Sequence, residues 1–351
     1  MSNLYKWYNR YLSLGNIKRK RELRKNCKKN VHSLLDKSHT IQVDNFWKDY
    51  CKVNPIFHSF YSEKTGKFSE QYMPDDVYYT KIDTYYNDWL AASIMDNKCL
   101  YDRYFPADII KQPETIIKRI NGFYFDSQGM IISLEQVTHI LKKLESAFLK
   151  KSVDSAGGHG VCYLSGTQLS EKFWNCANNW NEDFIMQIPI EQCKELQKIN
   201  KSSVNTIRLL SLLDKFGNVT IYSCILRMGI GDSKVDNASS GGITCGINDD
   251  GSLKNIAYSA AGEKYFIHPT SKVKFDTVTI PNFQSIKDVV KKLHQHVPSF
   301  RLLSWDIAVE ENGAPILVEC NFHFGELDFH QLNNGPLFGE DTIKILEEVF
   351  H

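Results

Sequence analysis

Several features that would assign this chain to a familiar class are missing from its 351 residues. No apolar run approaches the roughly 18 residues that a membrane-spanning helix needs, so we expect no transmembrane helix. The N-terminal region mixes aromatic and charged residues without a continuous apolar stretch, which argues against a secretory signal. The nine cysteines include no CxxC pair, and their odd number and scattered positions favour reduced thiols in a cytoplasmic protein.

Two common phosphate-binding motifs are also absent. The chain has neither a GxxxxGK[ST] loop nor a GxGxxG turn between a strand and a helix. The formal net charge is only +1, so bulk charge does not attract the chain to polyanions, and we expect no nucleic-acid partner.

The charge is unevenly distributed along the chain. Residues 1–40 contain eleven Lys and Arg against Glu22 and Asp36, which gives this segment a charge of +9 and the remainder −8. We expect a helix over residues 3–40, although Gly15 interrupts its pattern. The helix is either a solvated surface element or a basic segment on an anionic membrane or other polyanionic partner. The expected location is therefore cytoplasmic, either free or at the inner membrane face.

Further along, the pattern is that of alternating strands and helices. Residues 41–95 are rich in aromatic side chains and predict packed helices. Asn121-Gly122 predicts a hairpin turn between strands at 115–120 and 123–126. Ser133 with Gln136 is a capping box that begins a helix. Additional strands are predicted at 147–151, 184–190, 204–213 and 219–228.

Two apolar segments near the C-terminus carry the most informative polar residues. Residues 303–309 and 315–321 read as strands joined by a turn at 311–313. An antiparallel pairing brings Asp306 close to Glu319 and Asn321. Two carboxylates and an amide oxygen suit Mg²⁺, which prefers oxygen ligands shared with nucleotide phosphates. The alternative is a hairpin that exposes two acids to solvent.

Other candidate residues lie next to glycines or at the ends of predicted strands. Lys151 ends a predicted strand, and Gly157, Gly158 and Gly160 follow it, so main-chain N–H groups and a lysine are available for a polyphosphate. A plain hairpin is the alternative. Asn205, Arg208 and Arg227 lie at the ends of apolar strands, where they either line a cleft for an anion or are solvated on the surface.

Taken in order, these segments resemble the ATP-grasp superfamily, and in particular its sugar-transfer-associated branch. The similarity covers about residues 96–340. Its specificity lies in the order of the motifs, which are Lys98, Lys151 with the glycine turn, 187–190, 203–208, 226–229, 236–237, 241–242, 304–308, 319–321 and Gln331.

The resemblance implies an α+β ATP-grasp fold with two α+β lobes that clamp a nucleotide. The mostly helical region would be 1–95, the small lobe 96–186 and the large lobe 187–351. The cofactors would be ATP and Mg²⁺, with Asp306, Glu319 and Asn321 as metal ligands. Arg227, Asn205 and Arg208 would act in catalysis. Ser304 stands where many members carry an arginine, so either Arg227 or Arg208 supplies that charge or the charge is missing. The nucleotide would contact Lys98, Lys118, Lys151, Gly157, Gly158, Gly160, Asn237 and the backbone of Gln187, Ile188, Pro189 and Ile190.

The implied reaction is an ATP-dependent amide ligation through an acyl phosphate. A small or carrier-linked sugar acid and an amine would be joined, in polysaccharide, capsule or other glycan synthesis. His159, His323 and His330 either assist removal of a proton from the amine or have a structural role. The alternatives are an ATP-dependent phosphotransferase that resembles a sugar kinase, and a nucleotide-binding module without turnover.

Overall fold

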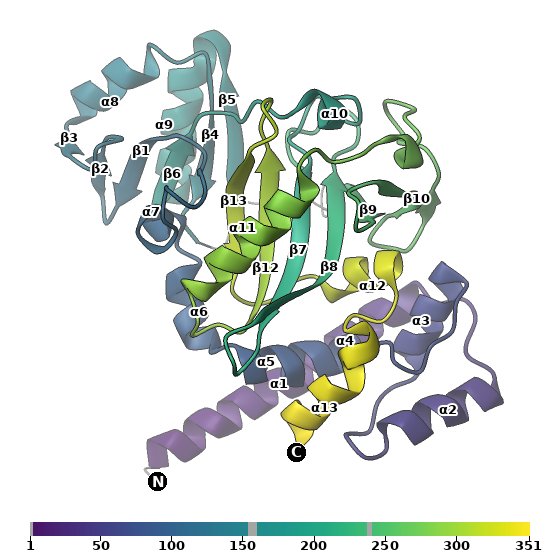
Figure 1. Cartoon of the computed structure of the whole chain (residues 1–351). Helices are drawn as coiled ribbons and strands as arrows, with labels where there is room; N and C mark the ends of the chain where they lie inside the picture. The colour runs from purple at the N-terminus through teal and green to yellow at the C-terminus, as the bar shows by residue number, and fades with distance from the viewer. Residues whose placement is uncertain (1–2, 154–159, 237–240) are drawn as a thin grey trace.

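A computed structural model describes residues 3–153, 160–236 and 241–351 of the chain. A small lobe, a large lobe and a helical region are visible in Figure 1, with both ends of the chain at the helical region. Gly157, Gly158, His159 and Asn237, which the sequence nominated, lie outside the described residues.

The N-terminal region is helical, as its aromatic-rich pattern predicted. The prediction of one helix over 3–40 is wrong, because the first helix ends at Lys29 and a second begins after Asp36. The Asp36 side chain accepts a hydrogen bond from the His39 N–H and caps this second helix. The helices are α1 (Asn3–Lys29), α2 (Lys37–Trp47), α3 (Ile56–Thr65), α4 (Asp75–Val77), a π-helical turn (Tyr78–Ile82), α5 (Asp83–Tyr86) and α6 (Trp89–Met95).

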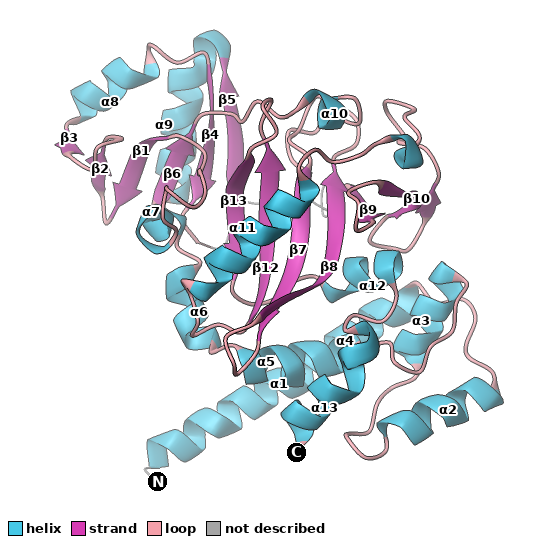
Figure 2. Cartoon of the chain, viewed as in Figure 1, coloured by secondary structure: helices cyan, strands magenta, loops and turns pink. Residues whose placement is uncertain are grey.

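The small lobe is a six-stranded antiparallel sheet with α8 and α9 against one face (Figure 2). The strand order is β3-β2-β1-β6-β4-β5. The predicted hairpin is confirmed, with Asn121 and Gly122 both at positive φ, and so is the capping box at the start of α8. The elements are β1 (Thr115–Ile120), β2 (Phe123–Phe125), β3 (Ile131–Ile132), α8 (Leu134–Leu141), β4 (Ser146–Lys151), β5 (Val161–Ser165), α9 (Leu169–Trp180) and β6 (Phe184–Gln187).

The large lobe is built on a seven-stranded antiparallel sheet in the order β11-β10-β9-β8-β7-β12-β13. Helix α11 packs on one face through Ile286 and Val290, and the N-terminal helices cover the other face, where Leu210 and Leu212 point. The elements are α10 (Lys194–Gln197), β7 (Thr206–Leu213), β8 (Val219–Met228), β9 (Ile243–Ile247), β10 (Leu253–Tyr258), β11 (Lys264–Tyr265), α11 (Phe283–Gln295), β12 (Leu302–Val309), β13 (Pro315–Asn321), α12 (Leu327–Asn334) and α13 (Thr342–Phe350).

The predicted pairing of the two C-terminal strands is confirmed. Asp306 on β12 lies opposite Glu319 on β13, and Ser304 lies opposite Asn321. A register shift follows Asp306, which leaves Val318 as the extra residue in β13. The turn closes with the Gly313 N–H donating to the Glu310 carbonyl at 2.8 Å.

The helical region and the large lobe share hydrophobic cores. One core joins Val77, Tyr78 and Ile82 to Leu302 of β12 and Leu346 of α13. Residues of the connecting segment that includes α7 (Tyr101–Tyr104), which precede the small-lobe strands, pack in the large-lobe core as well. None of the helices in the described part of the chain combines the length and apolar character needed to cross a bilayer.

Candidate active site

A cavity of about 430 Å³ lies between the small-lobe sheet and the large-lobe sheet. Five acidic and five basic side chains line it, so its formal charges balance. These are Asp96, Asp236, Asp306, Glu319 and Glu326 against Lys98, Lys150, Lys234, Arg208 and Arg227. An apolar part of the wall is formed by Phe148, Val161, Val204 and Val318.

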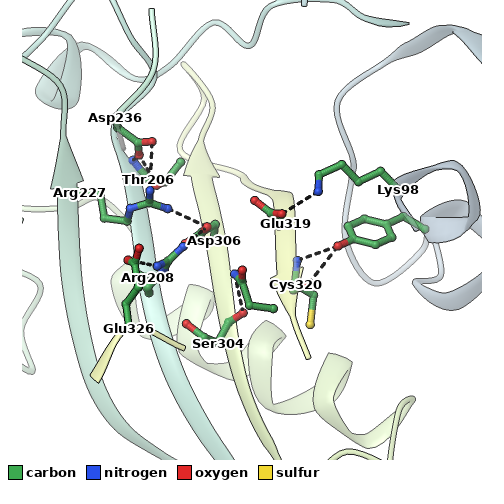
Figure 3. A network of polar contacts seen from close by, with 12 residues as sticks. Lys98, Thr206, Arg208, Arg227, Asp236, Ser304, Asp306, Glu319, Cys320 and Glu326 are labelled. Atoms are coloured by element: carbon green, nitrogen blue, oxygen red, sulfur yellow. Dashed lines mark hydrogen bonds and ion pairs between the residues drawn. The ribbon is translucent and has the colours of Figure 1, made fainter. Parts of the chain in front are cut away.

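Asp306 is the most heavily engaged acid of the cavity (Figure 3). The neighbouring strand β7 places Arg208 directly opposite it. Arg208 donates through Nε at 2.8 Å to Oδ1 and through Nη2 at 2.6 Å to Oδ2. Arg227 of β8 donates through Nη1 at 2.8 Å to Oδ2. Both arginines therefore place positive charge on the Asp306 carboxylate.

The two arginines decide the ionisation of Asp306. Burial raises the pKa of this carboxyl, but the charges of Arg208 and Arg227 outweigh burial and lower the pKa to about 2. The carboxylate is therefore ionised at neutral pH, held by charge-assisted hydrogen bonds. Arg208 is also paired with Glu326, which lies just beyond β13.

The other two predicted metal ligands also line the cavity. Lys98 Nζ donates to Glu319 Oε1 at 2.7 Å, and the Glu319 side chain is 32% exposed. Asn321 donates through Nδ2 to the Ser304 carbonyl at 3.3 Å, so its amide oxygen is the atom directed away from that carbonyl. The assignment of these residues as metal ligands stays a prediction.

The donor set is compatible with a hard cation such as Mg²⁺. The two oxygens of Asp306 offer about four lone-pair sites, of which the arginines use three, so one ligand position is left at Oδ1. Glu319 and the Asn321 amide add further oxygen atoms, as Mg²⁺ requires. Among the described residues no group of three His, Cys, Asp or Glu could hold a metal. A cation here would accordingly depend on the amide and on oxygens from water or phosphate.

Lys150, and not Lys151, faces the cavity. Alternation along β4 directs Ala147 and Leu149 into the small-lobe core, and Lys150 to the opposite face. Lys151 pairs with Glu182 at 2.9 Å and is not among the described residues that line the cavity, so its role as a phosphate ligand stays a prediction. Desolvation and the charge of Lys98 lower the pKa of Lys150 to about 8, a marked effect that the sequence reasoning missed. The alternation of β4 was the signal that favoured Lys150.

Two further predicted phosphate contacts lie elsewhere. Lys118 donates to the Cys99 carbonyl at 2.9 Å and to Asp102 at 2.8 Å, and therefore holds β1 to the segment that precedes it. Gly160 accepts from the Lys151 N–H at 2.8 Å, and a Cβ at this position would lie 3.0 Å from the Lys151 side chain. Neither residue is among the described residues that line the cavity, so their contacts with the nucleotide stay predictions.

The segment between the lobes borders the cavity through Gln187, Ile188 and Ile190. The Ile188 N–H donates to the Glu114 carbonyl at 2.9 Å, and Pro189 has no N–H. The Gln187 side chain donates to Thr115 Oγ1 at 3.1 Å inside the protein. No hydrogen bond of the described residues uses the Ile190 N–H. Of the predicted hinge residues after β6, Ile190 therefore keeps an N–H available to a ligand.

Asn205 makes structural hydrogen bonds in this structure and does not line the cavity, so its catalytic role stays a prediction. Its side chain is fully buried and donates to Gln192 Oε1 at 2.9 Å and to the Leu196 and Asn200 carbonyls at 3.0 Å. These bonds fix the loop that carries α10. The next residue, Thr206, is hydrogen-bonded to Asp236, an acid of the cavity wall that also lies 3.8 Å from Arg227.

The remaining histidines differ in position. His330 is fully buried against Ser223, and burial followed by the charge of Arg208 lowers its pKa to about 3, so it is neutral and structural. His323 lines the cavity and lies 3.1 Å from Asp96. The loop that follows it has positive φ at Phe324 and Glu326. No local sequence signal nominated Asp96 or Glu326, because each reaches the cavity only through tertiary packing.

The comparison with known families agrees with this geometry. The model of the family described as sugar-transfer associated ATP-grasp matches residues 78–345. No curated protein matches the chain.

Solved structures with a related fold are distant in sequence. The biotin carboxylase domain of 2-oxoglutarate carboxylase from Hydrogenobacter thermophilus is 13% identical with a TM-score of 0.44, over 74% of this chain and 47% of that one. The D-alanine-D-alanine ligase from Coxiella burnetii is 10% identical with a TM-score of 0.44, over 75% of this chain and 60% of that one. N5-carboxyaminoimidazole synthetase from Staphylococcus aureus is 8% identical with a TM-score of 0.44, over 72% of this chain and 53% of that one. The matched regions span about half the length of these proteins.

Proposed function

Because this chain belongs to the sugar-transfer associated ATP-grasp family, we propose that it is an ADP-forming, ATP-dependent carboxylate–amine ligase. The observation that carries the proposal is the convergence of the ionised Asp306 carboxylate, the Glu319 side chain, Lys98, Lys150 and two arginines in one cavity between the lobes. A triphosphate beside a carboxylate substrate needs this combination of cations and metal-binding oxygens.

The nucleotide is oriented by the segment that joins the lobes. The Ile190 N–H donates to the edge of the adenine ring, since the N–H groups before it are used or absent. Phe148 and Val318 are apolar wall residues suited to cover the ring from the two lobes. Lys150 and Lys98 then face the phosphates. This arrangement explains why an apolar zone and a charged zone adjoin in one cavity.

The reaction proceeds in two displacements. A carboxylate oxygen of the acid attacks the γ-phosphorus of ATP, the bond to the β–γ bridging oxygen breaks, and an acyl phosphate and ADP result. The amine then attacks the carbonyl carbon, the C–O bond to phosphate breaks, and inorganic phosphate leaves as the amine nitrogen loses its proton. Arg208 and Arg227 neutralise charge on the transferring group, and the cavity excludes water from it.

Asp306, Glu319 and Asn321 are the residues that would hold Mg²⁺, and the bound ion would supply charge neutralisation to the phosphate oxygens. Lys98, which pairs with Glu319 in this structure, would be available to contact phosphate once Glu319 held the ion.

The sugar-transfer association of the family supports the proposed substrate class. The proposed acid is a sugar acid, either free or carried on a lipid or glycan, and the acceptor is an amino compound of a polysaccharide or capsule pathway. The basic helix α1 supports contact with an anionic membrane surface at the cytoplasmic side. Sedimentation of the full chain with anionic vesicles, which should be lost at high salt, tests this part separately.

An ADP-release screen with paired uronic acids and amines tests the reaction. A ligase releases ADP only when both partners are present, and the product is an amide that mass spectrometry detects. ADP release with a sugar hydroxyl and no amine would instead indicate a phosphotransferase. Tight ATP binding without release under every pairing would indicate a binding module.

A further inference from the structure

Two cysteine thiols of the small lobe lie in direct contact. Cys162 on β5 and Cys176 on α9 have their sulfur atoms 3.0 Å apart, and the Cys176 thiol donates to Cys162. Since a disulfide bond is about 2.0 Å long, the sulfurs need to approach by only about 1 Å to form one. Both side chains are half-buried and pack against the small-lobe core.

The contact distinguishes these two cysteines from the other seven. All nine cysteines are within the described residues, and all are free thiols. The other thiols with recorded hydrogen bonds donate to backbone carbonyl groups: Cys27 to Ile56, Cys99 to Phe184, and Cys245 to Lys254 and Ile256. Within the described part of the chain, only Cys162 and Cys176 have each other as a hydrogen-bond partner.

We propose that Cys162 and Cys176 form a reversible disulfide that links β5 to α9 within the small lobe. In a reducing compartment the pair stays a dithiol, as the scattered cysteines of the sequence suggested. Burial, followed by the hydrogen bond with Cys176, raises the pKa of Cys162 to about 12, so this thiol is protonated at neutral pH and exchange is slow.

The oxidant is a low-molecular-weight disulfide such as oxidised glutathione. One protein thiolate attacks a glutathione sulfur, which breaks the glutathione disulfide and releases one glutathione thiol. The second protein thiolate attacks the protein sulfur of the mixed disulfide and releases the second glutathione thiol. The cysteine pair loses two electrons and two protons, and one glutathione disulfide is reduced to two thiols.

The position of Cys162 connects the disulfide to the nucleotide cavity. Cys162 lies opposite Leu149 in the β4–β5 pairing, and Val161 before it lies opposite Lys150. Val161 and Lys150 both line the cavity. Drawing Cys162 toward α9 therefore moves a strand whose other face borders the proposed nucleotide site. This consequence rests on the proposed function, whereas the disulfide itself does not.

Incubation of the reduced full-length protein with oxidised glutathione tests the site. We expect a product lighter by two hydrogen atoms, without bound glutathione, and peptide mapping that links Cys162 to Cys176. Dithiothreitol should restore the original mass. The oxidised protein should melt several degrees higher, because the link lowers the conformational entropy of the unfolded chain. Stable glutathione adducts on either cysteine, or two thiols that both stay open to alkylation, would overturn the disulfide.

Matched variants separate the pair from the remaining thiols. Cys51→Ser, which removes another half-buried thiol, should form the link like the wild type, whereas Cys162→Ser and Cys176→Ser should not. ATP affinity of reduced and oxidised protein is then compared, with a several-fold difference expected in the wild type and none in Cys162→Ser. Equal affinities would overturn the connection to the cavity. If the reduced protein did not bind ATP, this result would contradict the proposed function but not the disulfide.

Discussion

Lys150 and Lys151 are adjacent in the sequence, yet their ammonium groups lie in different surroundings. Lys150 borders the cavity, and Lys151 is paired with Glu182. The pair therefore offers a matched test of the nucleotide site in which the residue type and the strand are the same.

Lys150→Met should weaken ATP binding at least tenfold, because a cation facing the triphosphate is lost. Lys151→Met should change the affinity by less than about twofold, since an exposed ion pair contributes little. Titration calorimetry measures both. An equal loss in the two variants would contradict the assignment of the cavity face of β4.

The pH dependence of nucleotide binding follows from the same residue. Desolvation and the charge of Lys98 lower the pKa of Lys150 to about 8, so its charge is present below that pH and is lost as the pH rises through it. ATP affinity should therefore be steady near pH 7 and fall by up to about tenfold per unit above pH 8. Affinities measured between pH 7 and 9 should show this fall in the wild type but not in Lys150→Met. The same fall in both would assign the titration to another group.

Glu319→Ala should abolish ADP release at saturating ATP while the protein stays folded. The side chain is partly exposed, and its loss removes a metal-binding oxygen and frees Lys98 from its ion pair. Mg²⁺ titration of activity, with circular dichroism as the folding control, measures the effect. Wild-type activity in this variant would remove Glu319 from the metal site.

At the scale of elements, α12 connects the large lobe to the N-terminal helices. Gln331, which is part of the ordered motifs, is fully buried and bonds both backbone groups of Met73. It accepts from the Met73 N–H at 2.8 Å and donates to the Met73 carbonyl at 2.9 Å. Its role is therefore to join two elements distant in sequence, and it does not line the cavity.

Gln331→Leu should lower the free energy of unfolding by about 2–4 kcal/mol, because the Met73 N–H, the Met73 carbonyl and the Leu337 N–H lose a buried partner. Gln331→Glu should cost less at acidic pH, where the protonated carboxyl can both accept and donate, than near neutral pH, where a buried charge faces the Met73 carbonyl. Urea denaturation of both variants makes the comparison. A loss in Gln331→Leu below about 0.5 kcal/mol would show that water or a shifted backbone replaces the side chain.

At the scale of the whole molecule, the N-terminal region is part of the fold. Its helices cover one face of the large-lobe sheet, where Leu210, Leu212 and Leu302 are each at most 3% exposed. The region also supports the cavity loop, since the Tyr79 hydroxyl accepts from the Leu327 N–H at 3.1 Å, and Asp83 accepts from the Phe324 N–H at 3.3 Å.

Deletion of residues 1–95 should consequently give an aggregating or molten chain, because a contiguous apolar sheet face is exposed to water. Deletion of residues 1–15 alone serves as the control and should leave the melting temperature within a few degrees. Size-exclusion chromatography and thermal melting measure both truncations. A monomeric, cooperatively folded 96–351 fragment would show that the helical region is dispensable.

The sequence by itself determined the local elements and one long-range pairing. Apolar runs rich in β-branched residues predicted β7, β8, β12 and β13, and turn residues predicted the hairpins between them. The pairing of Asp306 with Glu319 followed because a short turn leaves a single register for a two-stranded ribbon.

Only the tertiary structure decided which of these side chains meet. The face of β4 that borders the cavity depends on the helices packed behind it, so Lys150 replaced Lys151. The structure gives hydrogen-bonding roles to Asn205, Lys118 and Gly160, whose residue types occur in structural positions as well as in binding sites. Their partners come from other segments of the chain. Asp96 and Glu326 reach the cavity through folding of the whole chain, because loop closure and packing are long-range effects that no local pattern records.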